Sequence, residues 1–118
     1  MRQTRWPSPL QMRTWDSGPV YLVVFRNRKR ADIDRAAYDA QADEMEALAR
    51  RQPGFLSFKS YTADDGEVVA LSEWQDEASA RNWGKVAEHR AAQADGRTRW
   101  YADYTLFACD DPRMHRFP

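Results

Sequence analysis

The stretch VYLVVFRN at residues 20–27 constrains the fold most, because its strand-forming residues carry apolar side chains on both faces. Successive side chains of a strand point to opposite sides of the sheet. A strand that is apolar on both sides therefore belongs in the centre of a sheet, with other elements packed against each face. The alternation places Val20, Leu22 and Val24 on one face and Tyr21, Val23 and Phe25 on the other.

The segment at residues 34–51 shows the clearest helical pattern in the chain. Asp32 or Asp34 can cap its first turn, and Pro53 with Gly54 ends it. Buried positions recur every three or four residues, as expected for a helix with one face against a core. These positions are Tyr38, Gln41, Met45 and Leu48.

Two further strand-like segments, residues 55–62 and 67–74, follow this helix and are joined by ADDG. The Asp65-Gly66 pair tolerates the positive φ angles of a tight turn, so a β-hairpin is predicted. The hairpin supplies the second and third strands of the sheet.

A second helix is predicted from a cap at Asp76 to about residue 94. Gly84 interrupts or weakens it, because glycine inside a helix costs about 1 kcal/mol relative to alanine. Gly96 is expected to end it, and TRWYADYTLFAC at residues 98–109 is the closing strand.

The resulting order, β-α-β-β-α-β, is that of a ferredoxin-like sandwich. This α+β fold is a four-stranded antiparallel sheet with two helices on one face. The other face would be bare in a single subunit, although the strands carry apolar and aromatic side chains on both sides. We therefore expect a homodimer in which two sheets pack face to face.

Length and composition exclude several classes of protein. A chain of 118 residues forms one domain. The 18 basic and 18 acidic residues cancel, so no long-range field would gather a nucleic acid. The single cysteine, Cys109, excludes an internal disulfide and a multi-thiolate metal site. No stretch approaches the roughly 20 apolar residues of a membrane span, so no membrane partner is expected.

Residues 1–17 contain Pro7 and Pro9 and show no periodicity, so they are predicted to form an N-terminal arm. Its arginines are not followed by an apolar signal-peptide core, and a cytoplasmic location is expected. Residues 18–118 form the predicted domain.

Three segments stand out within that domain: QPGFLSF after the first helix, ALSEW at the end of the third strand, and ARNW…EHRAAQADGRTRWYADYTLF. With these segments, the chain from about Val20 to Arg116 resembles the antibiotic biosynthesis monooxygenase (ABM) family. The resemblance implies a dimeric α/β barrel of ferredoxin-like topology, with a small aromatic-walled cavity between sheet and helices in each subunit. It leaves the reaction open, since related proteins include cofactor-free quinone-forming oxygenases and haem-degrading enzymes.

The resemblance also assigns candidate catalytic residues. In the cofactor-free members a phenol is deprotonated and its anion reacts directly with dioxygen, which requires a dry, anion-stabilising site. In the haem-degrading members a helix histidine ligates iron, while an asparagine on the first strand and a tryptophan on the second helix crowd the porphyrin. The matching positions here are Asn27, Trp83 and His89. Trp83 and His89 are six positions apart, closer than in the haem-degrading pattern, so the expected cofactor is none and haem is the alternative.

The candidate substrate-binding residues are aromatic: Trp74, Trp100, Tyr104 and Phe25. Alternation along the last strand places Trp100 and Tyr101 on opposite faces, one towards the helices and one towards the dimer partner, with Tyr104 on the face of Trp100. Each candidate also has a structural interpretation. His89 can act as a hydrogen-bonding residue in the fold, and Trp74 and Trp83 can fill the core.

Three functions remain open on this basis. The first is a cofactor-independent monooxygenase that acts on an aromatic or polyphenolic small molecule with dioxygen. The second is a haem-binding or haem-degrading protein, and the third is a dimeric module that binds a small ligand without catalysis. Paired carboxylates, a nucleophile elbow, a phosphate loop and a metal-binding cluster are absent from the sequence, so no metal site is expected.

Overall fold

A computed structural model describes residues 19–118, apart from the side chains of residues 87 and 88. The predicted arm at residues 1–17 lies outside the described residues. The predicted order of strands and helices is confirmed, with the second helix divided in two. The elements are β1 (Tyr21–Lys29), α2 (Arg35–Arg50), β2 (Phe55–Thr62), β3 (Val68–Trp74), α3 (Glu77–Lys85), α4 (Ala87–Asp95), the π-helical turn η1 (Gly96–Trp100) and β4 (Tyr101–Asp110).

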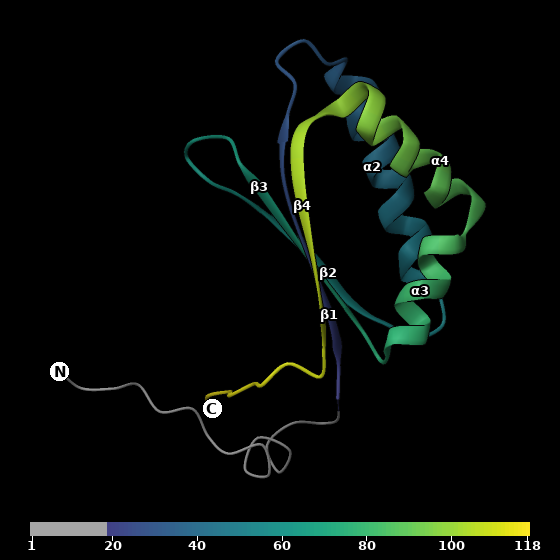
Figure 1. Cartoon of the computed structure of the whole chain (residues 1–118), viewed down its shortest axis with the longest axis vertical. Coiled ribbons are helices and arrows are strands. Elements are labelled where there is room, and N and C mark those ends of the chain that lie inside the picture. The colour runs from purple at the N-terminus through teal and green to yellow at the C-terminus, as the bar shows by residue number, and fades with distance from the viewer. Residues whose placement is uncertain (1–18) are drawn as a thin grey trace, which may run out of the picture.

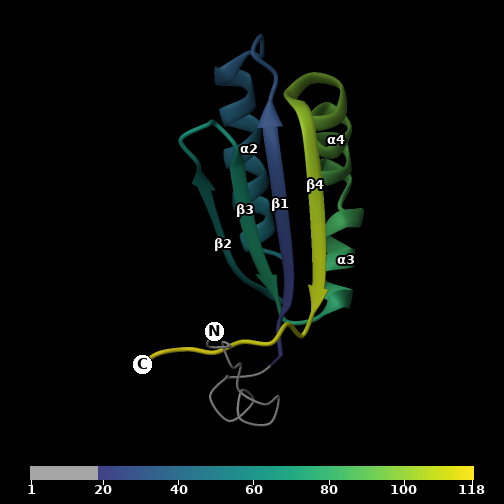
Figure 2. The same ribbon diagram turned by 60° about the vertical axis from the view of Figure 1, so that its left-hand side comes forward.

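The strands form one antiparallel sheet in the order β2-β3-β1-β4. The strand that is apolar on both faces, β1, lies between β3 and β4, as predicted from its sequence. The helices α2, α3 and α4 all lie on one side of the sheet, and the other side is open (Figures 1 and 2). This is the predicted ferredoxin-like arrangement. Within residues 19–118, every helix is too short or too polar to span a membrane.

Local sequence signals explain where the elements begin and turn. The Asp34 carboxylate accepts a hydrogen bond from the Ala37 N–H at 3.0 Å and caps α2. The Asp76 carboxylate accepts one from the Ser79 N–H at 2.8 Å and caps α3. In the β2–β3 turn Gly66 has a φ of +91°, the left-handed conformation that glycine adopts without strain.

The second helix differs from the prediction in the position of its break. Gly84 lies inside α3, and the chain leaves the helical conformation at Val86, with φ −62° and ψ 131°. A β-branched valine adopts extended backbone readily. The break releases the Trp83 carbonyl, which accepts from the Val86 N–H at 3.1 Å and from the His89 imidazole at 3.0 Å.

Gly96 is the C-cap of α4, as predicted, but the chain does not pass directly into the closing strand there. Its φ of −55° and ψ of −47° are helical, and the chain continues through the turn η1 to Trp100 before β4 starts at Tyr101. The glycine is required by close packing, because a Cβ there would lie 2.8 Å from the Tyr101 ring.

We expect Gly96→Ala to lower the free energy of unfolding by about 1–3 kcal/mol, because the added methyl overpacks the contact with Tyr101. Urea denaturation at fixed protein concentration measures this change. Gly84→Ala is the matched control, since a Cβ at Gly84 meets nothing within 4 Å. That variant should be neutral or more stable by up to about 1 kcal/mol. Equal effects of the two substitutions would contradict the packing argument.

Candidate functional site

The register of the sheet determines which strand residues face the helices. Phe25 pairs with Leu106, and Asn27 pairs with both Tyr104 and Val68. Residues that pair directly across antiparallel strands lie on the same face. This face is the one under the helices, because Phe25 contacts the Tyr101 ring, which in turn lies 6.3 Å from the Tyr38 ring of α2.

Asn27 is the buried polar side chain of this face, with 2% of its surface exposed. Its Oδ1 accepts a hydrogen bond from the Lys29 ammonium at 2.7 Å. Its Nδ2 has no hydrogen-bond acceptor among the described residues. A buried donor without a partner is uncommon in native structures, so this amide is a candidate for ligand binding.

Aromatic rings surround the amide on the strands. Phe25 lies 5.2 Å from Tyr101 and 5.3 Å from Tyr104, measured between ring centroids. Tyr104 and Leu106 are 42% and 55% exposed, so the helices do not cover this part of β4. Phe25, Tyr104 and Leu106 thus form an aromatic strip next to Asn27 in the register, exposed to solvent at Tyr104 and Leu106.

A second aromatic group lies where α3 and α4 meet the sheet. The rings of Trp83 and His89 stack at 4.1 Å and 13°, and Trp83 stacks on Trp74 at 6.3 Å and 25°. Phe55 meets Trp74 edge-on at 5.5 Å. The Trp74 side chain is 1% exposed and belongs to the core, which agrees with its structural interpretation.

The hydrogen bond of His89 determines its tautomer. A carbonyl oxygen only accepts, so the neutral ring must carry its proton on Nδ1 and donate it to the Trp83 oxygen at 3.0 Å. Burial lowers the pKa of His89 below its ordinary value, against a smaller opposite effect of the bond to Trp83. The imidazole is therefore neutral near pH 7, and Nε2 has a free lone pair with no partner among the described residues.

This lowered pKa predicts a pH dependence of stability. Below about pH 6.5 the unfolded chain binds a proton at His89 before the folded chain does, so stability falls as the pH falls. His89→Asn should reduce the loss of stability between about pH 7.5 and pH 5, measured by urea denaturation. In a proton NMR titration the His89 resonance, assigned with this variant, should have its midpoint below 6.5, the ordinary value. A midpoint above that value would contradict the prediction.

Trp100 is buried at the end of η1, where its ring meets that of Tyr38 edge-on at 5.7 Å. Its Nε1 donates to the Gln41 Oε1 at 2.9 Å, and the Gln41 Nε2 donates to the Asp95 Oδ2 at 2.8 Å. The guanidinium of Arg99 stacks 4.3 Å above the indole, and only 3% of Trp100 is exposed. These contacts give Trp100 a structural role at the end of η1.

The predicted division of Trp100 and Tyr101 between two faces of a strand is wrong. Trp100 precedes β4, and Tyr101 faces the helices rather than a partner, since it packs against Tyr38. Tyr104 lies on the same side as Tyr101, because the β1–β4 register passes over Ala102 and so shifts the alternation. The sequence does not signal this irregularity, and strict alternation therefore assigns Tyr104 to the wrong neighbour.

The predicted site residues thus form two groups on one side of the sheet. Asn27, Phe25 and Tyr104 lie together on β1 and β4, and His89, Trp83 and Trp74 lie together at the α3–α4 break. No described contact joins His89 to Asn27. Sequence reasoning missed Lys29, which bonds Asn27, and the rings of Tyr38 and Tyr101, which lie around the Lys29 ammonium. The only signal was the position of Lys29 two residues after Asn27, on the same face of the strand. No cluster of three or more potential metal-ligating side chains occurs among the described residues.

The comparisons with known proteins agree with this fold. The sequence profile described as "Antibiotic biosynthesis monooxygenase" matches residues 20–95, more than half of the chain. The chain is 32% identical over 99 residues to the uncharacterized protein YqjZ of Bacillus subtilis (strain 168), covering 84% of this chain and 85% of that protein. The chain belongs to the antibiotic biosynthesis monooxygenase family.

Two solved structures share the fold at lower identity. Rv0793 from Mycobacterium tuberculosis superposes with a TM-score of 0.67 at 20% identity, over 76% of this chain and 92% of that one. SnoaB from Streptomyces nogalater, described as a cofactor-independent oxygenase, superposes with a TM-score of 0.62 at 18% identity, over the same shares of the two chains.

Proposed function

We propose that this protein is a cofactor-independent monooxygenase that oxidises a phenolic aromatic small molecule with dioxygen. The observation that carries the proposal is the neutral imidazole of His89, whose Nε2 is unpaired in an aromatic layer between sheet and helices. Such a nitrogen can accept a phenolic proton near neutral pH. Membership of the family and the described activity of SnoaB support the same reaction class.

The reaction balances without a further reductant, because the substrate supplies all the electrons. Nε2 removes the phenol proton, and the electron-rich ring of the phenolate attacks dioxygen to form a carbon–oxygen bond. The resulting hydroperoxide takes up a proton and loses water, which leaves a quinone carbonyl. One oxygen atom enters the product, the other leaves as water, and the substrate loses four electrons. The reaction requires a base, a donor to an oxyanion and an apolar wall. We assign the base to His89 and its aromatic layer, while Asn27 and the aromatic strip, a separate group on the same side of the sheet, are the candidates for the donor and the wall.

The alternative of haem binding does not fit the arrangement of His89 and Trp83. In the haem-degrading pattern the tryptophan crowds the porphyrin. Here the Trp83 ring stacks on the face of the His89 imidazole at 4.1 Å and 13°, so it packs against the histidine and not against the space beyond Nε2. Haem is therefore not part of the proposed reaction.

Substitutions at His89 test the proposed oxygenase. His89→Asn keeps an amide N–H at the position of Nδ1, able to bond the Trp83 carbonyl, and removes the base. We expect it to lower the rate of oxygen consumption with hydroxylated naphthalenes or anthrones by about 10²–10⁴-fold, with little change in stability. His89→Ala should lose the same activity and also about 1–3 kcal/mol, because the Trp83 carbonyl then lacks a donor. An oxygen electrode and thermal denaturation measure the two effects.

His115→Gln, a change in the C-terminal tail, is the control for loss of a histidine as such. Wild-type protein that binds these phenols without consuming oxygen would instead favour the non-catalytic binding module. Unchanged turnover in His89→Asn would exclude His89 as the base.

We also infer that two copies pair through the open face of the sheet. The register places apolar residues from three strands together on this face: Leu22, Val24, Val69, Leu71, Phe107 and Cys109. The helices lie on the opposite side of the sheet (Figure 2), so they do not cover this face, and a second copy would remove it from water. The tail after β4 leaves on the same side of the sheet, with Phe117 94% exposed (Figure 1).

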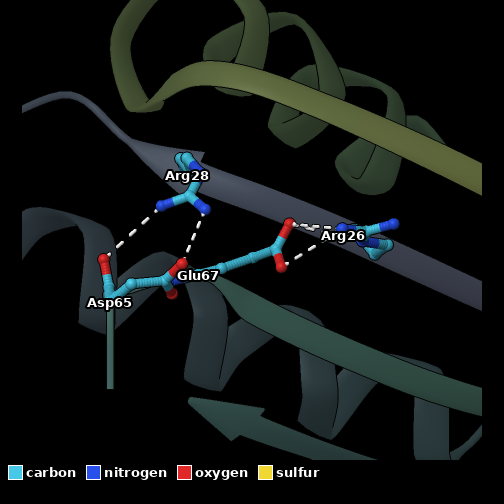
Figure 3. Close-up of polar contacts among 4 residues, drawn as sticks. All are labelled: Arg26, Arg28, Asp65 and Glu67. Carbon is cyan, nitrogen blue, oxygen red and sulfur yellow. Dashed lines mark hydrogen bonds and ion pairs between the residues drawn. The ribbon is translucent and has the colours of Figure 1, made fainter. Parts of the chain in front are cut away.

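The charges at one end of the open face are compatible with pairing of identical copies. Arg26 and Glu67 form an ion pair at 3.1 Å, and Arg28 and Asp65 form one at 2.9 Å (Figure 3). The hydrogen bond from Arg28 holds the pKa of the Asp65 carboxyl below its usual value. Because each arginine of β1 is neutralised by its own hairpin, two copies would not bring unpaired like charges together here.

A further inference from the structure

Lys29 fixes which end of the Asn27 amide is available to a ligand. An ammonium group has three donors and no acceptor, so only the Oδ1 end of the amide can lie 2.7 Å from it. The Nδ2 end must then point away from Lys29. Side-chain amides can often be turned over without loss of contacts, but here the chemistry of the partner allows one orientation.

The ammonium is itself held by two aromatic rings. It lies 4.8 Å from the centroid of the Tyr38 ring and 5.6 Å from that of the Tyr101 ring, within the range of cation–π attraction. The irregularity between Arg28 and Lys29 brings Lys29 opposite Tyr101 in the register. Tyr101 remains a neutral phenol near pH 7, since burial and the adjacent Tyr38 raise its pKa. The group formed by Lys29, Tyr38 and Tyr101 thus carries one positive charge, on Lys29.

The chemistry of the free Nδ2 limits what it can bind. It is a donor, so it requires an acceptor oxygen, and its 2% exposure gives it almost no water to bond. The charge on Lys29 draws electron density towards Oδ1 and so strengthens the Nδ2–H groups as donors. An anionic oxygen gains most from this arrangement. The strip beside it, with Tyr104 and Leu106 exposed, suits the apolar ring to which such an oxygen is attached.

We propose that Lys29 is a positioning residue, which holds Asn27 as a hydrogen-bond donor and makes the site select the phenolate form of an aromatic ligand. This deepens the proposed oxygenase function and rests on it for the reaction, but the selection itself is a property of binding. Lys29 does not touch the ligand in this scheme; it acts through the Asn27 amide and through its charge.

The test uses alizarin (1,2-dihydroxyanthraquinone), whose absorption moves to longer wavelength when a hydroxyl ionises. Wild-type protein should lower the pKa of bound alizarin relative to the free dye. Lys29→Met should reverse this shift by about one unit, a tenfold loss in the preference for the anion. Lys29→Arg, which retains charge and donors, should keep most of the shift. Asn27→Asp should abolish it, because the carboxylate pairs with Lys29 and presents no donor.

The matched control is Lys59→Met. Lys59 also lies over a tyrosine ring, 5.4 Å from the centroid of Tyr61, but on the open face of β2. Its substitution should leave the pKa of bound alizarin unchanged. An unchanged dye pKa in Lys29→Met, or no binding of alizarin by the wild type, overturns the proposal.

A second measurement covers the case in which Lys29→Met does not fold. In the ¹⁵N-labelled wild type, the side-chain NH₂ signal of Asn27, assigned with Asn27→Asp, should shift when alizarin is added. An unshifted signal in the presence of bound dye overturns the proposal. Neither measurement needs turnover, so a dye shift that depends on Lys29 in a protein that consumes no oxygen would contradict the oxygenase function and leave this inference standing.

Discussion

Trp74→Ala should lower the free energy of unfolding by about 3–5 kcal/mol, the range for removal of a large aromatic side chain from a core. Trp74 is 1% exposed and packs between Phe55 and Trp83. Its loss leaves a cavity beneath α3 and also deprives the Ser72 hydroxyl of the indole N–H that bonds it at 3.1 Å. Urea denaturation at one fixed protein concentration measures the change, since association would otherwise alter the apparent stability.

Two variants separate packing from other effects at Trp74. Trp74→Phe retains a ring against Phe55 and should recover part of the lost stability. Leu106→Ala removes an apolar side chain from the same side of the sheet, but Leu106 is 55% exposed, so its change should stay within about 0.5 kcal/mol. A small effect of Trp74→Ala, similar to that of Leu106→Ala, would contradict the assignment of Trp74 to the core.

The sequence predicts those features that depend on neighbouring residues along the chain. The apolar residues on both faces of β1, the cap at Asp34 and the positive φ of Gly66 are local signals, and each is confirmed. Together with chain length they are sufficient for the order of elements and the ferredoxin-like topology.

The features that the sequence does not predict depend on contacts between distant segments. The break at Val86 is one, because the nearby Gly84 is the expected helix breaker, yet the Trp83 carbonyl and the His89 side chain meet at the actual break. The side of Tyr101 is another, since it depends on the irregular β1–β4 register.

In the candidate site, too, the residue identities come from the sequence and the contacts between them come from the fold. Asn27 and His89 were identified through a resemblance, but their chemistry depends on partners 2 and 6 residues away whose geometry only the fold supplies. The free Nε2 of His89 follows from the Trp83 carbonyl, and the free Nδ2 of Asn27 follows from Lys29. The His89 bond requires a helix break that residue spacing does not show. The spacing of Asn27 and Lys29 permits their bond, but it does not show that the Lys29 ammonium turns to Asn27 and not to solvent.

Leu71→Arg is expected to convert the proposed dimer into a monomer. Leu71 pairs with Val24 on β1, and Val24 pairs with Phe107 on β4, so Leu71 lies within the apolar part of the open face. An unpaired charge buried in such an interface costs about 3–5 kcal/mol. Two-fold symmetry places one such charge on each subunit, so the cost is counted twice. At the lower value the total of about 6 kcal/mol corresponds to roughly a 10⁴-fold increase in the dissociation constant.

Light scattering across a dilution series measures this change against the subunit mass of 13.8 kDa. Leu106→Arg is the matched control, because it places the same new charge on an exposed leucine of the opposite face and should leave the dimer intact. A wild-type protein of monomer mass at micromolar concentration would contradict the dimer itself. A Leu71→Arg protein that remains dimeric while Leu106→Arg dissociates would instead place the interface on the helix-bearing side. In that case the exposed strip beside Asn27 would be covered by the partner, and the same pair of variants would show that the ligand site is shared between subunits.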